Sequence, residues 1–313
     1  MKTGLFSHPD CLGHAPPRGH PERPERLRSV LDALGEPEFA GLLRETAPLS
    51  SRGSLERVHA PRMIDDVLDR LDGEARDAGY AAIDGDTVMS PRSATAALRA
   101  AGAVIAAVDS VMTGTMGNAF CAVRPPGHHA ERARAMGFCL FNNVAIGAMH
   151  ARAAHGLSRI AVVDFDVHHG NGTQDIFFDD ANLFYLSTHQ MPLYPGTGFA
   201  NERGVADNVL NRPLPPGAGS ANFRAIYSES VLPALEAFRP EFIFISAGFD
   251  AHRDDPLAQL NLVEEDFHWV TREICVVAAR ACDGRVVSTL EGGYDLDALA
   301  RCSAAHVRAL LEA

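Results

Sequence analysis

The sequence predicts one α/β domain built on a parallel β-sheet. Short, continuous apolar runs rich in β-branched and aromatic residues recur along the chain, as is typical of strands covered on both faces. Longer segments with helical character separate these runs, and the alternation implies right-handed βαβ crossovers within one sheet. Although 313 residues would allow two domains, α/β folds often exceed about 200 residues as one unit. We therefore expect residues 1–313 to form a single domain.

Each expected element follows from its local pattern. Apolar runs predict strands at residues 4–6, 119–123, 160–163, 183–186, 242–245 and 286–290. Helical patterns predict helices at residues 93–112, 142–154, 222–238, 263–282 and 296–311. Ser93, Asn142 and Asn222 are expected to be N-caps, because short polar side chains accept hydrogen bonds from free N–H groups of the first turn. The stretch 211–219 is rich in proline and glycine, but the alternation resumes after it, so we expect a surface loop.

Composition and charge exclude several classes of protein. The chain carries 28 basic and 40 acidic side chains, a formal net charge of −12, so no nucleic-acid partner is expected, whereas cationic ligands would be weakly attracted. Its six cysteines form no C-x-x-C pair, which argues against a disulfide framework or a zinc–thiolate site. We find no secretory signal and no run approaching about 18 apolar residues, and therefore expect a cytoplasmic protein without a membrane partner.

The residues that follow the strand at 160–163 suggest a metal site. Asp164, Asp166 and His168 alternate along an extended chain and would project to the same side. Carboxylates and imidazoles are zinc ligands at about 2.0–2.2 Å. A capped polar turn is the structural alternative, but burying these groups unpaired beside an apolar strand would be costly. Asp250, just beyond the strand at 242–245, could supply a third ligand, although a loop aspartate more often caps the next helix.

Two further turns carry groups suited to proton transfer. Proline and glycine make the turn RPPGHH (124–129) rigid enough to present His128 and His129 in a defined direction, and imidazole is well matched to proton transfer near neutral pH. In EGGY (291–294) the phenol of Tyr294 could donate a hydrogen bond to a developing oxyanion. A solvated surface turn or an ordinary helix start explains either motif when it is taken alone.

The position of all four segments favours an active site. Each comes directly after a predicted strand, and ligands of open α/β sheets bind beyond the carboxyl ends of the strands. Three ligands and an open position describe a catalytic metal site, at which the metal activates water and polarises a carbonyl. Hydrolysis is the expected reaction, because the sequence has no phosphate-binding loop, HExxH helix or nucleophile elbow.

From about residue 6 to residue 311, the chain resembles the histone deacetylase superfamily, which includes bacterial acetylpolyamine amidohydrolases and acetoin-utilisation proteins. The resemblance implies an arginase-like single domain with a central eight-stranded parallel sheet flanked by helices. The shared motifs are GHPERPERL (19–27), RPPGHH (124–129), MGFCLFNN (136–143), DFDVHHGNG (164–172), YPGTG (194–198), AGFD (247–250) and EGGY (291–294).

The resemblance also implies two kinds of bound metal ion. One zinc ion per chain would be held by Asp166, His168 and Asp250, with iron(II) left open as the metal used in the cell. A structural potassium ion would lie among residues that bind it largely through backbone oxygens, namely Asp164, Asp166, His168, Ser187 and Thr188.

For the reaction itself, the resemblance makes His129 the general base and then the general acid. His128 would be its electrostatic neighbour, with Asp164 as the carboxylate partner of His128, and Tyr294 would hold the substrate carbonyl. The walls of a narrow acyl-lysine tunnel would be formed by Gly137, Phe138 and Tyr194.

Three positions bear on differences within the family. Asn171 stands behind the second active-site histidine, where class I members place an aspartate and class II-like members an asparagine, so we expect a lower pKa for His129 than in class I. Tyr194 occupies a position where phenylalanine is frequent. Leu257 matches a gatekeeper that is glutamate in one polyamine-selective branch, and leucine cannot pair with a distant ammonium, which favours acyl-lysine or a small acyl-amine.

The function that these residues favour is zinc-dependent hydrolysis of an acetyl or other short acyl group from a primary amine. An acetylpolyamine amidohydrolase is the first alternative. A binuclear manganese ureohydrolase is a second, although His252 stands where a further acidic ligand is expected. A non-catalytic acyl-amine binding module is a third, but binding alone needs neither Tyr294 nor paired histidines. The sequence does not specify the physiological substrate, the acyl length or the oligomeric state. A homo-oligomer is compatible with it.

Overall fold

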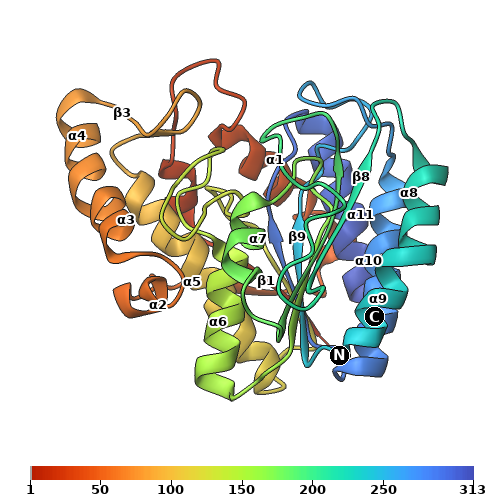
Figure 1. The fold of residues 1–313 in the computed structure, drawn as a ribbon. Coiled ribbons are helices and arrows are strands. Elements are labelled where there is room, and N and C mark those ends of the chain that lie inside the picture. The colour runs from red at the N-terminus through yellow and green to blue at the C-terminus, as the bar shows by residue number, and fades with distance from the viewer. Residues whose placement is uncertain (1) are drawn as a thin grey trace.

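The computed structural model describes residues 2–313 as one α/β domain around an eight-stranded sheet (Figure 1). The strands are β1 (Thr3–Ser7), β2 (Leu43–Thr46), β5 (Asn118–Cys121), β6 (Ile160–Asp164), β7 (Leu183–Gln190), β8 (Val209–Leu214), β9 (Phe242–Ala247) and β10 (Val286–Leu290). They are all parallel, in the order β2-β1-β5-β10-β9-β6-β7-β8. The two-residue strands β3 (Ala81–Ala82) and β4 (Val88–Met89) pair separately. The expected fold class is confirmed.

Helices cover both faces of the sheet. They are α1 (Pro24–Ala33), α2 (Arg52–Glu56), α3 (Pro61–Asp65), α4 (Leu71–Ala78), α5 (Ser93–Met112), α6 (Asn143–His155), α7 (Asn171–Phe177), α8 (Ser220–Ile226), α9 (Leu232–Phe238), α10 (Glu264–Ala281) and α11 (Leu296–Glu312). In Figure 1, α5 and α6 lie on one side of the sheet, and α10 and α11 lie on the other. The resulting three layers bury the apolar strands, as the continuous apolar runs predict.

The six expected strands are all present, but two edge strands were not expected. β2 carries charged residues, and β8 overlaps the proline- and glycine-rich stretch at 211–219. The interpretation of that stretch as a surface loop is wrong for residues 211–214, which pair with β7. Both strands lie at sheet edges, where one side needs no partner, and an edge tolerates Pro213 although it lacks an N–H group. Edge strands therefore lack the apolar signature of central ones.

The long expected helices are present, with differences in their caps and in the continuity of one of them. Asn142 is the N-cap of α6, and its side chain accepts a hydrogen bond from the Ala145 amide at 3.0 Å. The other two N-cap expectations are wrong, because Arg92 precedes α5 and Gly219 precedes α8. A π-helical turn at Tyr227–Val231 divides the expected helix at 222–238 into α8 and α9. The helices α1 to α4, which have 10 residues or fewer, are not among the expected elements.

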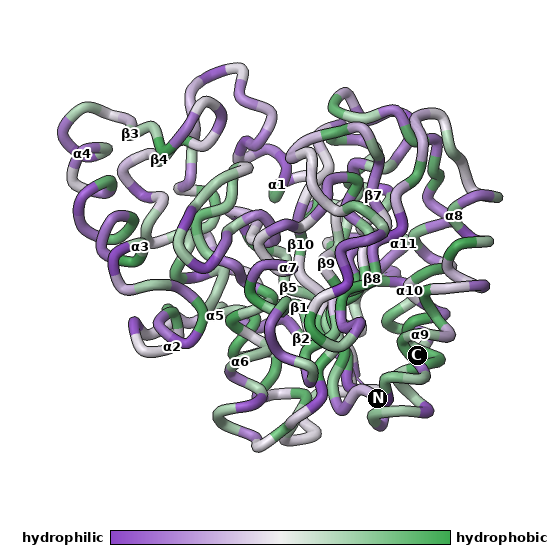
Figure 2. The backbone as a smooth tube through the Cα atoms, viewed as in Figure 1, coloured by the Kyte–Doolittle hydropathy of each residue, from purple (hydrophilic) through white to green (hydrophobic). Residues whose placement is uncertain are grey.

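Helix α5 is the element that bears on the expectation about membrane spans. By length and composition it is apolar enough to cross a membrane, although 56% of its apolar window is buried inside the domain. It packs against α6 and against β1, β5 and β10, so packing onto the sheet accounts for its apolar residues. Figure 2 shows hydrophobic residues concentrated in the central strands and the helices beside them.

The order of the strands brings the four sequence motifs together. The motifs follow β5, β6, β9 and β10, and these are the four consecutive central strands in the order β5-β10-β9-β6. Because the four strands are parallel, their carboxyl ends meet at one edge of the sheet, where ligands bind in such folds. Segments more than 100 residues apart in the sequence thereby form one site.

Candidate active site

A buried cluster of two carboxylates and one imidazole lies at this edge. Nδ1 of His168 is 3.2 Å from Oδ1 of Asp166 and 3.1 Å from Oδ2 of Asp250. One ligand atom from each residue lies within 4.8 Å of the others, and all three residues are buried. The structure thus brings together the three residues expected to bind zinc.

Backbone amides fix the carboxylates of this cluster. Asp166 accepts hydrogen bonds from the amides of His168 and Gly292 at 2.9 and 2.8 Å, and Asp250 accepts one from Val167 at 2.8 Å. β6 ends at Asp164, so a turn, rather than the alternation of an extended strand, brings Asp166 and His168 side by side. The orientation of both carboxylates is therefore set by the main chain.

The charges in the cluster are strongly coupled. Burial alone disfavours a charged carboxylate, but the imidazoles of His128 and His168 lower the pKa of Asp166 below its usual range. Burial also disfavours a charged imidazole, yet hydrogen bonds to Asp166 and Asp250 raise the pKa of His168 to about 10. The carboxylates thus favour a positive charge at the Nδ1 atom of His168, which a metal ion could supply in place of a proton.

The two histidines after β5 lie together but differ in their surroundings. Their ring centroids are 4.1 Å apart. Nδ1 of His128 is 3.0 Å from Oδ2 of Asp164, and although burial opposes it, the charges of Asp166 and Asp164 raise the pKa of His128 to about 10. Burial and the neighbouring His128 and His168 lower the pKa of His129 well below its usual value. Without a bound metal ion, these directions favour a charged His128 beside a neutral His129.

Asn171 determines which ring nitrogen of His129 faces the pocket. Its Oδ1 atom is 2.8 Å from Nδ1 of His129, and its Nδ2 atom donates to Oε1 of Glu131 at 2.7 Å. The amide oxygen therefore faces the imidazole, which places the proton on Nδ1 and leaves Nε2 as the acceptor. Glu131 belongs to none of the sequence motifs, and its contribution is visible only in three dimensions.

Glu291 is a buried carboxylate whose role the sequence did not indicate. Its Oε2 atom accepts hydrogen bonds from the amides of Gly127 and His128 at 2.7 and 3.1 Å, and its Oε1 atom accepts one from Ser246. Burial raises its pKa to about 7, even though the positive charge of His128 opposes the change. Glu291 thus links the segment after β10 to the turn that carries both histidines.

A pocket of about 220 Å³ opens above the cluster. The side chain of Tyr294 is 9% exposed at its wall, and burial raises the pKa of its phenol well above the usual value, so that the group remains a hydrogen-bond donor. Seven lining residues were singled out from the sequence, whereas Asp86 and Leu193 were not, because no motif contains them. The lining residues are Asp86, His129, Gly137, Phe138, His168, Leu193, Tyr194, Leu257 and Tyr294.

Two glycines permit close approach around the site. A Cβ atom on Gly137, whose φ is +56°, would lie 2.6 Å from the ring of His129. A Cβ atom on Gly292 would lie 2.0 Å from Oδ2 of Asp250. Both contacts are too short for any side chain, so these glycines allow the backbone to pass against the imidazole of His129 and the carboxylate of Asp250.

The residues expected around potassium lie on the paired strands β6 and β7 and in the segment that follows β6. Ser187 and Thr188 are buried on β7, and Ser187 pairs in register with Asp164. Their hydroxyl groups are occupied elsewhere, since Ser187 Oγ is 2.9 Å from Nδ1 of His189 and Thr188 Oγ1 is 3.3 Å from the hydroxyl of Tyr227. An ion bound here would need the backbone oxygens, as the resemblance implies.

His252 does not join the metal cluster. Its ring nitrogens instead face Asp254 and Glu264 at 3.6 and 3.5 Å. Within residues 2–313, the group at the pocket that could hold a metal consists of three ligands. A second bridging carboxylate, which a binuclear site requires, is not part of that group.

Known proteins resemble the chain along its whole length. The histone deacetylase domain model matches residues 20–310. The chain is 40% identical to "Histone deacetylase 14, chloroplastic" of Arabidopsis thaliana, over 98% of this chain and 76% of that protein. It is also 40% identical to "Type-2 histone deacetylase 2" of Dictyostelium discoideum, over 100% of this chain but only 21% of that much longer protein. The solved structure titled "Crystal Structure of HDA15 HD domain" has a TM-score of 0.93 and 35% identity, and the match covers 99% of this chain and 88% of that one.

Proposed function

The chain belongs to the histone deacetylase family, as its motifs predicted, and we propose that it is a zinc-dependent amidohydrolase that removes an acetyl or other short acyl group from a primary amine. The observation that carries the proposal is the cluster of Asp166, His168 and Asp250 beneath a pocket whose wall also contains His129 and Tyr294. A group that could hold a metal ion, an imidazole that could act as a base and a phenol thus lie around one small space.

The donor set fits zinc. Two carboxylates and one imidazole leave a fourth position open toward the pocket, as in catalytic rather than structural zinc sites. Their mutual burial also fits a cation, because two buried carboxylates repel each other unless positive charge lies between them. When bound, zinc would lower the pKa of a water molecule and polarise the substrate carbonyl.

His129 would move the protons. Its Nδ1 atom is engaged by Asn171, so Nε2 can accept a proton from the attacking water and then give it to the leaving amine. Its lowered pKa keeps it in the neutral form that this first step needs. His128, held as a cation by Asp164 and Asp166, would stabilise negative charge as the carbonyl carbon becomes tetrahedral.

Tyr294 would donate a hydrogen bond to the carbonyl oxygen of the substrate. The guanidinium of Arg26 lies 4.8 Å from the centroid of its ring, and Arg26 also donates to the carbonyl oxygen of Gly293 at 2.5 Å. Asp255 accepts a hydrogen bond from the Tyr294 amide at 2.7 Å. These contacts fix the backbone of Tyr294 and the position of its ring, so little reorganisation of the tyrosine is needed during the reaction.

The shape of the pocket supports acyl-lysine or a small acyl-amine as the substrate. Gly137, Phe138 and Tyr194 would enclose the acyl group and the aliphatic part of the amine, and Leu257 adds an apolar wall without charge. The presence of Asp86 in the same lining supports an acetylpolyamine as a second candidate, because its carboxylate could pair with a distal ammonium.

We further propose a structural potassium ion among backbone oxygens of Asp164, Asp166, His168, Ser187 and Thr188.

The six cysteines are all free thiols, which supports the expected cytoplasmic, reducing setting.

A substrate panel tests the proposal. Acetyl-lysine peptide, acetylputrescine and acetylspermidine would be incubated with the zinc-loaded wild type and with His129→Ala, and acetate release measured. We expect wild-type turnover of at least one substrate and a loss of at least ~10²-fold in the variant. Binding of the substrates without acetate release would support the non-catalytic module, and urea release from guanidino substrates with manganese would support the ureohydrolase.

A further inference from the structure

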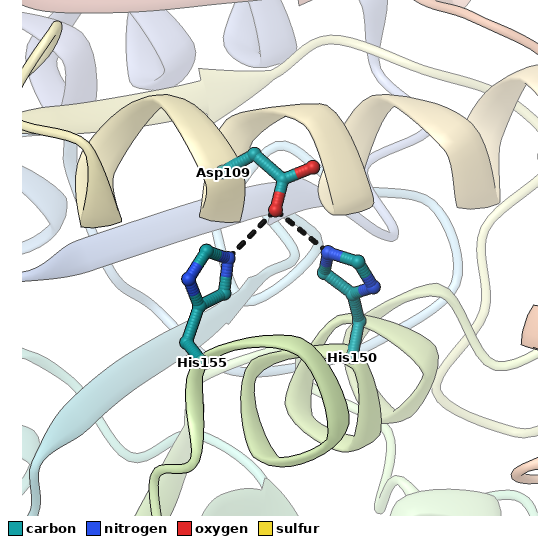
Figure 3. Close-up of side chains that lie close together, drawn as sticks. All are labelled: Asp109, His150 and His155. Carbon is teal, nitrogen blue, oxygen red and sulfur yellow. Dashed lines mark hydrogen bonds and ion pairs between the residues drawn. The ribbon is translucent and has the colours of Figure 1, made fainter.

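A second cluster of metal-ligating side chains lies between α5 and α6. Asp109 is near the end of α5, and His150 and His155 are in the last two turns of α6. Nε2 of each histidine is 2.7 Å from the same oxygen, Oδ1 of Asp109. Figure 3 shows the two imidazole rings on either side of this oxygen, with the other carboxylate oxygen pointing away from them.

This cluster lies far from the pocket. α6 begins at Asn143, close to the pocket segment that contains Phe138, and has 13 residues, so its two ends are about 20 Å apart. His155 is its last residue. The carboxyl ends of α5 and α6 both point toward the cluster, and their partial negative charge adds to that of Asp109. The local field therefore favours a cation.

The geometry and exposure suit a metal ion. One ligand atom from each residue lies within 4.8 Å of the others. Tetrahedral zinc with bonds of about 2.0–2.1 Å would place its ligand atoms about 3.3 Å apart, so the carboxylate must move away from the rings by about half an ångström. The side chain of Asp109 is 48% exposed, which allows this movement, gives an ion access and leaves room for a water ligand.

The protonation of the histidines also permits metal binding. Nδ1 of His150 is buried and has no hydrogen-bond partner among residues 2–313. The carboxylate of Asp109 can only accept, so without a metal Nε2 of each histidine donates to it. A metal ion bound at Nε2 would replace that proton, and the unpartnered Nδ1 of His150 could carry the remaining proton of its ring. Two imidazoles and one carboxylate are ligands typical of zinc and of neighbouring transition metals.

We propose that Asp109, His150 and His155 form a binding site for one divalent transition-metal ion that links α5 to α6. The site contains no group that reaches the pocket, so its occupancy stabilises the domain and does not contribute to turnover. The inference does not depend on the proposed reaction.

Zinc itself is the probe for the test. Metal-free, untagged protein is dialysed against buffered free zinc, and the bound zinc per chain and the melting temperature are measured. The variants are Asp109→Asn and the double variant His150→Gln/His155→Gln. The matched control is His268→Gln, because Nε2 of His268 contacts one carboxylate, that of Glu312 at 3.0 Å, without a second imidazole.

We expect the wild type and the control to bind one zinc more than either variant, and zinc to raise their melting temperatures further. Equal zinc content in all four proteins would overturn the proposal. So would a fall in the melting temperatures of the variants that is the same with and without zinc, because a hydrogen-bonded contact alone would behave in this way. Asp109→Asn changes a half-exposed side chain and keeps the test valid should the double variant fail to fold.

The second site also changes how total metal content is interpreted. Two metal ions per chain in the wild type would not by themselves indicate a binuclear ureohydrolase, because one of them could occupy this site. If the double variant keeps one ion and releases acetate as the wild type does, the ion that it keeps is assigned to the pocket and the ion that it lost to the site between α5 and α6. A double variant that still holds two ions would place both elsewhere and contradict the inference.

Discussion

Asn171 Oδ1 lies 2.8 Å from Nδ1 of His129, while the amide nitrogen of the same asparagine donates to Glu131 at 2.7 Å. The side chain is thus held at both ends, and its neutral oxygen orients the imidazole without adding negative charge. Burial and the positive charges of His128 and His168 then keep the pKa of His129 low. A neutral amide is consistent with a base that remains unprotonated over a wide range of pH.

Asn171→Asp should move the acidic limb of the pH profile of kcat/KM to higher pH. A carboxylate beside His129 favours imidazolium and raises its pKa, so more of the base is protonated at any given pH. The new carboxylate would also face that of Glu131, so Asn171→Asp/Glu131→Gln is the appropriate companion variant. An acidic limb that stays in place in both variants would show that another group controls it.

Leu257→Glu should shift substrate preference toward acetylated polyamines. Its side chain lines the pocket, and a partly exposed ion pair with a distal ammonium contributes about 0.5–1 kcal/mol, or about 2- to 5-fold in the ratio of kcat/KM values. Asp86→Asn should shift that ratio in the opposite direction. Both ratios come from competition between acetylspermidine and an acetyl-lysine peptide, and an unchanged ratio in both variants would exclude a role for charge at these two lining positions.

Glu22→Gln should destabilise the protein by about 3–5 kcal/mol, because it leaves buried positive charge without its partner. Glu22 is fully buried beside Arg124, Arg26 and His14. Urea unfolding measures the effect. Glu25→Gln is the control, since its pair with Arg28 is about half exposed and should contribute less than about 1 kcal/mol. Similar losses in the two variants would contradict this account.

Stability should fall as the pH drops from about 6.5 to 4, and His59 should contribute to that fall. Burial lowers its pKa from 6.5 to about 4, against the opposing effect of a hydrogen bond to the Glu131 carbonyl. Between these values the unfolded chain binds more protons than the native protein, so the free energy of unfolding rises with pH. The stability that depends on a neutral His59 is fully present above about pH 6.5 and is lost as the pH falls toward 4.

His59→Gln should reduce the loss of stability between pH 7 and pH 5 by about 2 kcal/mol, since about 1.5 pH units of the interval from 6.5 to 4 lie above pH 5 and each corresponds to about 1.4 kcal/mol. Glutamine can still accept a hydrogen bond from the Asn142 amide, as Nε2 of His59 does at 2.9 Å. Urea unfolding of both proteins at pH 7 and pH 5 gives the comparison. The same difference between the two pH values in variant and wild type would rule out His59 as a source.

Local patterns were sufficient for the central strands and the long helices. The strands β5, β6, β9 and β10 are apolar on both faces, so their sequences identify them without reference to neighbours. Edge strands such as β8 are exposed on one side and tolerate residues such as Pro213, which removes the local signal. Helix α5 has the expected bounds, but its N-cap is Arg92 rather than Ser93, because capping depends on backbone geometry that propensity does not specify.

What the sequence determined by itself is the set of chemical groups: two carboxylates and a histidine for a metal, paired histidines and a tyrosine, each placed after a strand. Tertiary structure alone decided what surrounds them, including the amide oxygen that orients His129, Glu291 against the histidine turn, and Asp86 in the pocket lining. It also paired Asp109 with two histidines more than 40 residues away. The physical reason is that a pattern along the chain specifies which side chains project from each element, whereas contacts between elements depend on strand order and helix packing.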